Sequence, residues 1–281
     1  MEHKIGLVFD GGGGKGAYQI GVWKALREVG LDKYVTAVSG SSVGGLNAAL
    51  FVKGDFAEAE YIWTEEISKI NPLRLQMYVS ELIDKHLGDM SFFDGSPIDC
   101  FITAYNKRSS NNLESYEHTS NGNIKIAYNG KAEYYNMRYL TDEARRDYIQ
   151  QNALRKSVLL ATSALPVLCK SVKLNLTGKS KKYLEDGGVK DNSPALPLAV
   201  AKRCDTIIAV HLDSEVGINK KKFHNVLEIN PTRDTGGLFS GLLNFSTDHT
   251  KMLINLGYHD SIKIFKAVKK NWQKEELYYV L

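Results

Sequence analysis

The 281-residue sequence is poor in cysteine, and its three cysteines, Cys100, Cys169 and Cys204, stand far apart. It contains no CxxC pair, so neither a disulfide framework nor a zinc site is indicated. Long apolar runs are also lacking, and no stretch approaches the roughly 20 apolar residues of a membrane-spanning helix. The first apolar run, Lys4–Phe9, is too short for the core of a signal peptide. These absences predict a cytoplasmic protein without a metal or cofactor.

A large excess of one charge is missing as well, since the formal net charge is only +4. The lysines are scattered, and no basic stripe interleaves with aromatic residues, which argues against a nucleic-acid-binding surface. Small lysine clusters occur within residues 179–182, 220–222 and 266–270. Each is typical of a solvated face, and they leave room for peripheral contact with an anionic membrane.

What the sequence does contain at its start is a parallel α/β pattern. Residues 4–9 and 35–39 are short apolar runs that predict buried strands, and each run leads into glycines and then a helix. The first helix carries apolar residues at positions 22, 25, 26 and 29 and should end at Gly30; the second spans about 43–53 and should end at Gly54. A length of 281 residues favours one α/β domain over two small ones.

The rest of the chain is predicted more coarsely. We expect helices over about 56–87, with Pro72 as an interruption, over 143–162, and in a C-terminal helical part within 237–281. An extended segment near 99–105, a polar loop at 109–123, and strands at 206–212 and 226–229 are also expected. Asn129-Gly130 predicts the turn of a hairpin within 124–137.

Gly40-Ser41-Ser42-Val43-Gly44 fits the GxSxG pattern of a nucleophile elbow. A strand that turns sharply into a helix exposes the central serine at the helix N-terminus, where the helix dipole stabilises nearby negative charge. The flanking glycines Gly40 and Gly44 remove side chains that would clash at this turn. Ser41 is the rival nucleophile, but it falls at a variable position of the pattern, so Ser42 is preferred.

Asp10 is followed by four glycines, Lys15 and Gly16, which form a second glycine-rich junction between a strand and a helix. A P-loop needs Ser or Thr after the lysine, and here Gly16 follows. The spacing of a dinucleotide fingerprint, GxGxxG, is present, but the acidic residue expected at the end of the second strand is absent. The third interpretation, an oxyanion hole built from backbone N–H groups, accounts best for a nucleophilic serine at the neighbouring strand end.

A serine nucleophile also needs a base, because an unassisted hydroxyl is hardly ionised at neutral pH. Four histidines, at positions 211, 224, 249 and 259, follow the Asp186-Gly187-Gly188 triplet, as a Ser–Asp–His order would require. None has a recognisable setting, and His211 lies within an apolar strand, where a core histidine is the simpler interpretation.

Taken together, the motifs resemble those of the patatin-like phospholipase family: an early DGGGxKG loop, GxSxG some 25 residues later, and a distant DGG. Two further segments, Ala161–Leu168 and the stretch after Asp186 with Asn192 and Pro194, are similar to that family's Ala-Ser-x-Ala-x-Pro and Asp-Gly-Gly-x-x-x-Asn-x-Pro segments. The resemblance covers residues 4–54 and 155–200 well.

The resemblance implies a three-layer α/β/α fold with a mainly parallel central sheet and a Ser–Asp dyad without a catalytic histidine. It assigns Ser42 as the nucleophile, Asp186 as the base, and Gly11, Gly12 and Gly13 as oxyanion donors. Lys15 would assist the oxyanion or a lipid phosphate. Gly14 departs from the family, which usually has a larger residue there. The expected shielding of the base should raise its pKa towards the working range.

The function expected on these grounds is hydrolysis of lipid acyl esters, as by a phospholipase A or lysophospholipase. Two alternatives remain: a short-chain esterase or thioesterase with the same dyad, and a non-catalytic module that binds a nucleotide or another anion. Turnover is expected to be independent of calcium. The sequence does not indicate an oligomeric state.

Overall fold

The computed structural model describes residues 3–140, 148–176, 181–201, 203–218, 223 and 225–280. A ten-stranded sheet runs through it in the order β10-β9-β1-β2-β3-β6-β5-β4, and β8, which also pairs with β7, joins at β3. Neighbours from β10 to β3 are parallel, whereas the strands beyond β3 are antiparallel. The prediction of an α/β fold with a mainly parallel sheet is therefore confirmed.

The parallel strands are β1 (Ile5–Phe9), β2 (Val35–Ser41), β3 (Asp99–Asn106), β9 (Thr206–Val210) and β10 (Val226–Ile229). The strands of the antiparallel part are β4 (Glu114–His118), β5 (Ile124–Asn129), β6 (Ala132–Asn136), β7 (Val172–Leu174) and β8 (Lys182–Asp186). Strand β1 is wholly buried and β2 nearly so, as expected of parallel strands covered on both faces.

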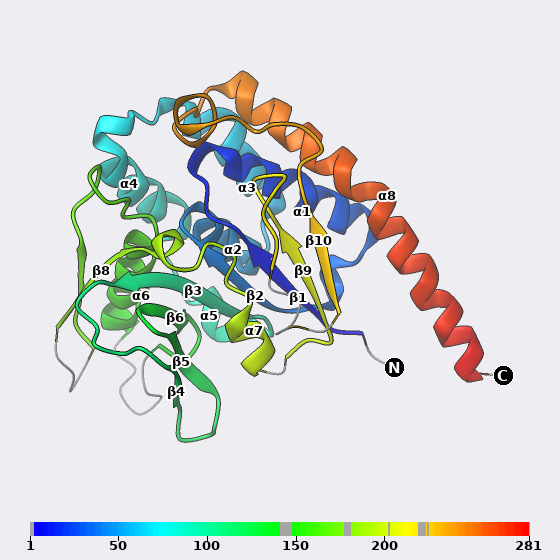
Figure 1. Cartoon of the computed structure of the whole chain (residues 1–281), viewed down its shortest axis with the longest axis horizontal. Helices are drawn as coiled ribbons and strands as arrows, with labels where there is room; N and C mark the ends of the chain where they lie inside the picture. The colour runs from blue at the N-terminus through cyan, green and yellow to red at the C-terminus, as the bar shows by residue number, and fades with distance from the viewer. Residues whose placement is uncertain are drawn as a thin grey trace.

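Helices cover both faces of the sheet (Figure 1). The main apolar core lies between one face and the helices α1 (Ala17–Val29), α2 (Val43–Lys53), α6 (Tyr148–Thr162) and α8 (Thr247–Val280). A smaller core lies on the other face, where the short α7 (Leu196–Ala201) packs. The remaining helices are α3 (Phe56–Tyr61), α4 (Leu75–Leu87) and α5 (Phe92–Gly95).

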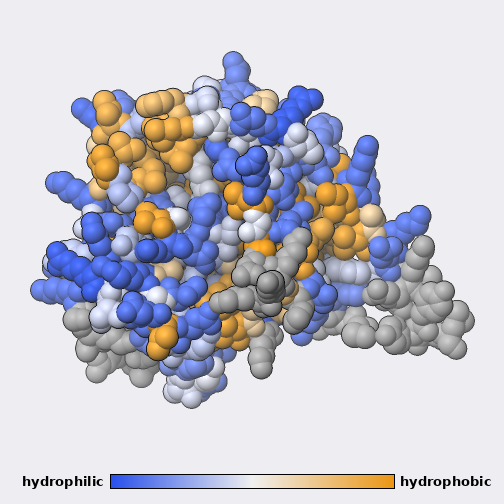
Figure 2. All heavy atoms as spheres, in the orientation of Figure 1, coloured by the Kyte–Doolittle hydropathy of each residue, from blue (hydrophilic) through white to orange (hydrophobic). Residues whose placement is uncertain are grey.

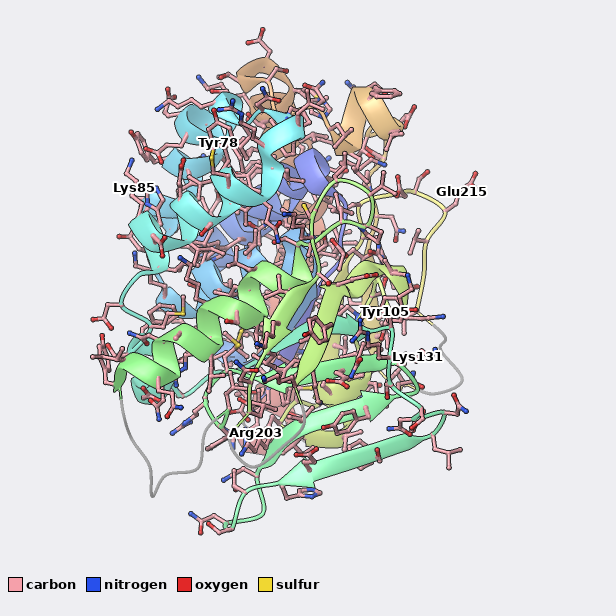
Figure 3. All side chains as sticks on the ribbon, turned by 90° about the vertical axis from the view of Figure 1, so that its left-hand side faces the viewer. Tyr78, Lys85, Tyr105, Lys131, Arg203 and Glu215 are labelled. Carbon is pink, nitrogen blue, oxygen red and sulfur yellow. The ribbon has the colours of Figure 1, made fainter. Side chains whose placement is uncertain are left out.

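The two predicted helix ends are confirmed by backbone geometry. Helix α1 ends at Gly30 with φ 75° and α2 ends at Gly54 with φ 84°, both in the left-handed region that glycine adopts without strain. The hairpin predicted within 124–137 is confirmed, but its turn consists of Gly130 and Lys131, because Asn129 is the last residue of β5 and pairs with Ala132. Figure 3 shows Tyr105 of β3 beside Lys131 of this turn, whereas Tyr78 and Lys85 of α4 lie apart from them, at the upper left.

Some strands of the antiparallel part differ from the sequence-based expectations. Residues 114–118, which we expected in a polar loop, form the edge strand β4, whose side chains are mostly polar and exposed and therefore show no apolar alternation. The strands β7 and β8 were not anticipated. Residues 143–147 of the predicted helix, His224, and the lysines at 179 and 220–222 lie outside the described residues. Within the described part of the chain, no helix is both long and apolar enough to cross a membrane.

Candidate functional site

Ser42 occupies the turn where β2 passes into α2, and its backbone has φ 54° and ψ −129°. This conformation is rare for a residue with a side chain, and such strain is concentrated at functional positions. The glycines on either side permit the turn. A Cβ atom on Gly40 would lie 2.2 Å from the carbonyl oxygen of Gly44, and one on Gly44 would lie 2.3 Å from that of Phe9. The GxSxG spacing is thus a steric requirement of this elbow.

The two adjacent serines have opposite surroundings. The Ser41 side chain is completely buried, and its hydroxyl has no hydrogen-bond partner among the described residues. Ser42 instead lines a pocket, and its backbone N–H donates to the Thr162 hydroxyl at 2.8 Å. Ser42 is therefore the serine that a substrate could reach.

The Ser42 hydroxyl donates to Oδ2 of Asp186 at 2.6 Å. Asp186 ends β8, and the 3-10 turn that follows it, which includes Gly187, brings the Gly188 N–H within 2.8 Å of the other carboxylate oxygen, Oδ1. The Asp186 N–H donates to the Ala164 carbonyl oxygen at 3.0 Å. These contacts fix the carboxylate in position with one oxygen facing the serine.

Burial raises the pKa of Asp186 to about 6, against its ordinary value of 3.8. The side chain is only 2% exposed, so the charged form has lost most of its hydration. The hydrogen bonds from Ser42 and Gly188 lower the pKa and offset part of this effect. The carboxylate is thus a stronger base than an exposed aspartate and is still largely ionised at neutral pH.

The glycine loop lies beside the elbow, since β1 and β2 are parallel neighbours. Its first glycine differs from the expectation. The Gly11 N–H donates to the Asn192 carbonyl oxygen at 3.2 Å, while the Asn192 side chain donates to the Gly11 carbonyl oxygen at 3.1 Å. The Gly11 amide is therefore engaged within the protein, which argues against the expectation that it is an oxyanion donor. Gly13, which lines the Ser42 pocket, begins a 3-10 turn that Gly16 closes.

The unusual Gly14 has a steric explanation. A Cβ atom there would lie 2.1 Å from the carbonyl oxygen of Asn244, because the turn before α8 packs directly on the glycine loop. A larger residue at this position would therefore displace the segment that leads into α8.

Lys15 is nearly buried, and its ammonium group lies 2.5 Å from Oδ1 of Asp213. The Lys15 ammonium group was expected to contact a substrate oxyanion or phosphate. In this structure it is instead paired with a carboxylate of the same chain. This pair has no local signal in the sequence, because its members lie 198 residues apart.

Within the described residues, which leave out His224, no histidine bonds the Ser42 hydroxyl. His211 is completely buried, with Nδ1 2.8 Å from Oδ2 of Asp10 and Nε2 3.6 Å from Glu228. It is a core histidine paired with a carboxylate, as expected. The carboxylate that accepts from the Ser42 hydroxyl is that of Asp186.

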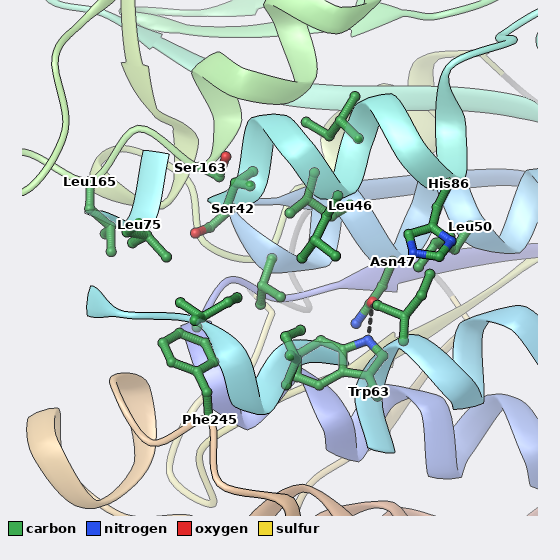
Figure 4. A pocket seen from close by; sticks show the side chains of 18 of the residues that line it. Ser42, Leu46, Asn47, Leu50, Trp63, Leu75, His86, Ser163, Leu165 and Phe245 are labelled. Carbon is green, nitrogen blue, oxygen red and sulfur yellow. Dashed lines mark hydrogen bonds between the residues drawn. The ribbon is translucent and has the colours of Figure 1, made fainter. Parts of the chain in front are cut away.

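An apolar pocket extends from Ser42 along α2 (Figure 4). Leu46 and Leu50 stand one and two turns beyond the serine, on the helix face that lines the pocket. The opposite wall comes from residues 62–87, and Leu165 and Phe245 lie near the serine. These residues were not identified from the sequence, although the helix predicted over 56–87 covers most of the wall.

His86 lines the end of the pocket away from Ser42 and belongs to a charged cluster (Figure 4). His86 Nδ1 lies 3.0 Å from Glu58 Oε1, and Nε2 lies 2.8 Å from Glu66 Oε2. Lys85 also bonds Glu66, and the hydrogen bonds from Lys85 and His86 lower the pKa of Glu66 to about 2. Beyond this cluster an apolar chain would have to displace paired charges, so the cluster sets the floor of the pocket.

A buried chain of amides braces the glycine loop against α2. Gln19 donates to the Asp10 carbonyl oxygen at 2.7 Å, and the Asn47 side chain donates to Gln19 Oε1 at 2.8 Å. Asn47 Oδ1 in turn accepts from the Trp63 indole N–H at 2.9 Å, in the pocket wall (Figure 4). The loop, the elbow helix and the pocket wall are thereby held in one arrangement.

Among the described residues, no group of three or more His, Cys, Asp or Glu side chains could hold a metal ion.

These observations define a three-layer α/β/α fold with a mainly parallel central sheet. Within it, a serine elbow lies beside a glycine loop. The chain belongs to the patatin-like phospholipase family, whose model matches residues 7–199. A curated relative, lysophospholipase nte1 of Aspergillus terreus, is 43% identical over 49 residues, which are 17% of this chain and only 3% of that protein. Membership of the family supports a lipid acyl hydrolase activity.

Solved structures share the fold at low identity. VipD from Legionella pneumophila has a TM-score of 0.51 at 14% identity, covering 95% of this chain and 67% of that one. Human GIVD cytosolic phospholipase A2 has a TM-score of 0.51 at 11% identity, covering 95% of this chain and 59% of that one. At these identities the likeness concerns the fold alone.

Proposed function

We propose that this protein is a serine lipid acyl hydrolase of the phospholipase A or lysophospholipase type, with Ser42 as nucleophile and Asp186 as base. The observation that carries the proposal is the 2.6 Å hydrogen bond from the Ser42 hydroxyl to Asp186, at one end of a pocket lined almost wholly by apolar side chains. A nucleophile bonded to its base is the arrangement that acyl transfer needs.

In the acylation step, Asp186 accepts the Ser42 proton as Oγ attacks the ester carbonyl carbon. The alcohol leaves with that proton and the acyl group stays on Ser42. Water, deprotonated by the same carboxylate, then hydrolyses the acyl-enzyme and regenerates both residues. A buried carboxylate with a pKa of about 6 suits both steps, since a base works best when its pKa is near the working pH.

The developing oxyanion needs donors close to Ser42. Because the Gly11 amide bonds Asn192, the backbone N–H groups of Gly12 and Gly13 are the donors we propose. Removal of one well-placed donor of this kind costs roughly 3 kcal/mol of transition-state stabilisation. In this scheme Lys15 acts indirectly: paired with Asp213, it holds the loop in place.

The pocket favours a lipid acyl chain over a short acyl group. Ser42 and Leu50 are eight residues apart on one helix, which corresponds to about 12 Å at 1.5 Å per residue. An acyl chain that starts at Ser42 and runs past Leu46 would be buried along this length, up to the cluster around His86. A short-chain esterase or thioesterase would leave most of this apolar surface unused.

A fluorophosphonate probe tests the nucleophile. Wild-type protein should be labelled, and Ser42→Ala should not. Ser41→Ala is the matched control, because the hydroxyl of the adjacent Ser41 is buried and has no hydrogen-bond partner in the described structure. Labelling of Ser42→Ala, or none of the wild type, would refute the assignment and favour a non-catalytic anion-binding module. Activity confined to short soluble esters, with none on phospholipid vesicles, would instead favour the esterase alternative.

A further inference from the structure

Large apolar side chains are exposed around the Ser42 end of the pocket. We call this set the apolar rim; it consists of Leu73, Met77, Val167, Leu168, Leu238 and Phe239. Leu73 is 84% exposed and Phe239 is 79% exposed, whereas the pocket floor at His86 is buried. Single exposed apolar residues are ordinary, but a group of them around an active-site pocket indicates a binding surface.

The rim comes from three separate segments that all reach the pocket. Leu75, Leu165 and Leu242 line it, and each lies within four residues of rim members on its own segment. The Gln76 side chain donates to the Lys170 carbonyl oxygen at 2.9 Å and accepts from its N–H at 3.1 Å, which joins two of the segments. Figure 2 shows apolar side chains gathered over α4 and the turn at 238–242 (η8).

One rim residue is held outward by a strained backbone. Val167 has φ 75°, a conformation that is a marked outlier for a β-branched residue, and its side chain is fully exposed. The side chain packs against little of its own chain, so burial within the protein does not offset the strain. Backbone strain of this kind is concentrated at functional positions, which is consistent with a binding role for Val167.

The charges of the three segments identify the partner. Residues 69–77, 163–174 and 235–247 contain no aspartate or glutamate, but they contain Lys69, Arg74, Lys170 and Lys173, all exposed. Exposed apolar side chains next to exposed cations are complementary to a lipid bilayer with anionic headgroups. Because this surface surrounds the pocket, a lipid could pass from the bilayer to Ser42 without crossing water.

We infer that the apolar rim docks the protein on anionic membranes, with Leu73, Val167 and Phe239 inserted among the acyl chains and the four cations at the headgroups. The inference rests on the proposed function, because it supplies the lipid that Ser42 would attack. It commits to a bilayer as the partner, and a second copy of the chain is the alternative that the experiment must separate.

The experiment measures binding without turnover. Full-length Ser42→Ala protein is sedimented with vesicles of phosphatidylcholine alone or with added phosphatidylserine. Binding should be stronger with phosphatidylserine and should fall with salt, because exposed charges are screened. Leu73→Ser and Phe239→Ser should each weaken binding by about tenfold, since each removes a large apolar side chain that would be buried in the bilayer. The matched control is Leu113→Ser: Leu113 is 75% exposed but lies just before β4, at the other end of the molecule.

A second readout separates this inference from the proposed function. In the otherwise wild-type protein, the rim variants should hydrolyse a soluble butyrate ester normally and lose activity only on vesicles, since Leu73 and Phe239 do not line the pocket. Equal vesicle binding by rim variants and Leu113→Ser overturns the inference, as does a rim variant that changes only self-association in gel filtration. If the wild-type protein hydrolyses no ester at all, the proposed function is refuted. The vesicle-binding measurement still tests whether the apolar rim docks on membranes.

Discussion

The hydroxyl group of Ser42 and the carboxylate of Asp186, 144 residues apart in the chain, are joined by a hydrogen bond of 2.6 Å in a buried setting. The burial matters as much as the distance, because it raises the pKa of the carboxylate to about 6.

Turnover should depend on pH through the ionisation of Asp186. Asp186 can accept the serine proton only when it is ionised, so kcat/KM for a soluble butyrate ester should rise with pH through about 6 and then level off. Ser41→Ala should show the same profile. A profile that is already flat from pH 4 upward would mean that the base is another group or that its pKa is ordinary.

Asp186→Asn should separate catalysis from stability. Loss of the base should reduce kcat by about 10²–10⁴-fold. The raised pKa also means that the folded state binds the proton more tightly than the unfolded chain, so the unfolding free energy falls as the pH rises from about 4 to about 6. Above that range the buried charge costs on the order of 2–3 kcal/mol.

Asparagine carries no charge, so Asp186→Asn should be more stable than the wild type at pH 8 and about equal to it at pH 4. Urea denaturation at the two pH values measures this difference. If the variant were less stable at pH 8, the carboxylate would be contributing favourable contacts that outweigh its desolvation.

A large side chain at Leu46 should shorten the acyl chain that the pocket accepts. Leu46→Trp would fill the space next to Ser42, and each methylene group excluded from the pocket costs about 0.8 kcal/mol of binding. Hydrolysis of p-nitrophenyl palmitate and dodecanoate should fall far more than that of the butyrate. Leu46→Met is the control and should keep the wild-type order; an unchanged order in Leu46→Trp would place the acyl chain elsewhere.

Removal of the amide brace should weaken both fold and site. Asn47→Leu would leave the Trp63 N–H and the Gln19 amide without their partner, at a cost of about 1–3 kcal/mol for each buried group. Thermal unfolding measures the loss of stability. In Trp63→Phe the N–H is already gone, so the double variant should lose less stability than the sum of the single ones. Strict additivity would show that the two side chains are not coupled.

Turnover is predicted to be independent of calcium. In the proposed mechanism a carboxylate supplies the base and backbone amides stabilise the oxyanion, so no step requires a metal. Hydrolysis of a soluble ester should be the same in excess chelator and in added calcium. Complete loss of activity in chelator, restored by calcium, would contradict this scheme.

Much of the fold was predictable because its signals are local. The apolar runs of β1 and β2, and the glycines that end α1 and α2, depend on residues adjacent in the chain. Strand β4 was missed because an edge strand that is largely exposed carries no apolar alternation. Of the site residues, Ser42 was identifiable from its own turn, since the clashes that require Gly40 and Gly44 arise within that turn and with the adjacent strand.

Other features depend on contacts between distant segments, and only the tertiary structure decides them. Strand, turn and cap preferences act over a few residues, so the elbow serine, the glycine loop and the order of the elements up to α2 could be predicted from the sequence. The fold decided that Asp186 meets Ser42, that Asn192 engages the Gly11 amide and that Asp213 holds Lys15. Sheet order and burial set these pairings, and neither is written in the local pattern around any one of these residues.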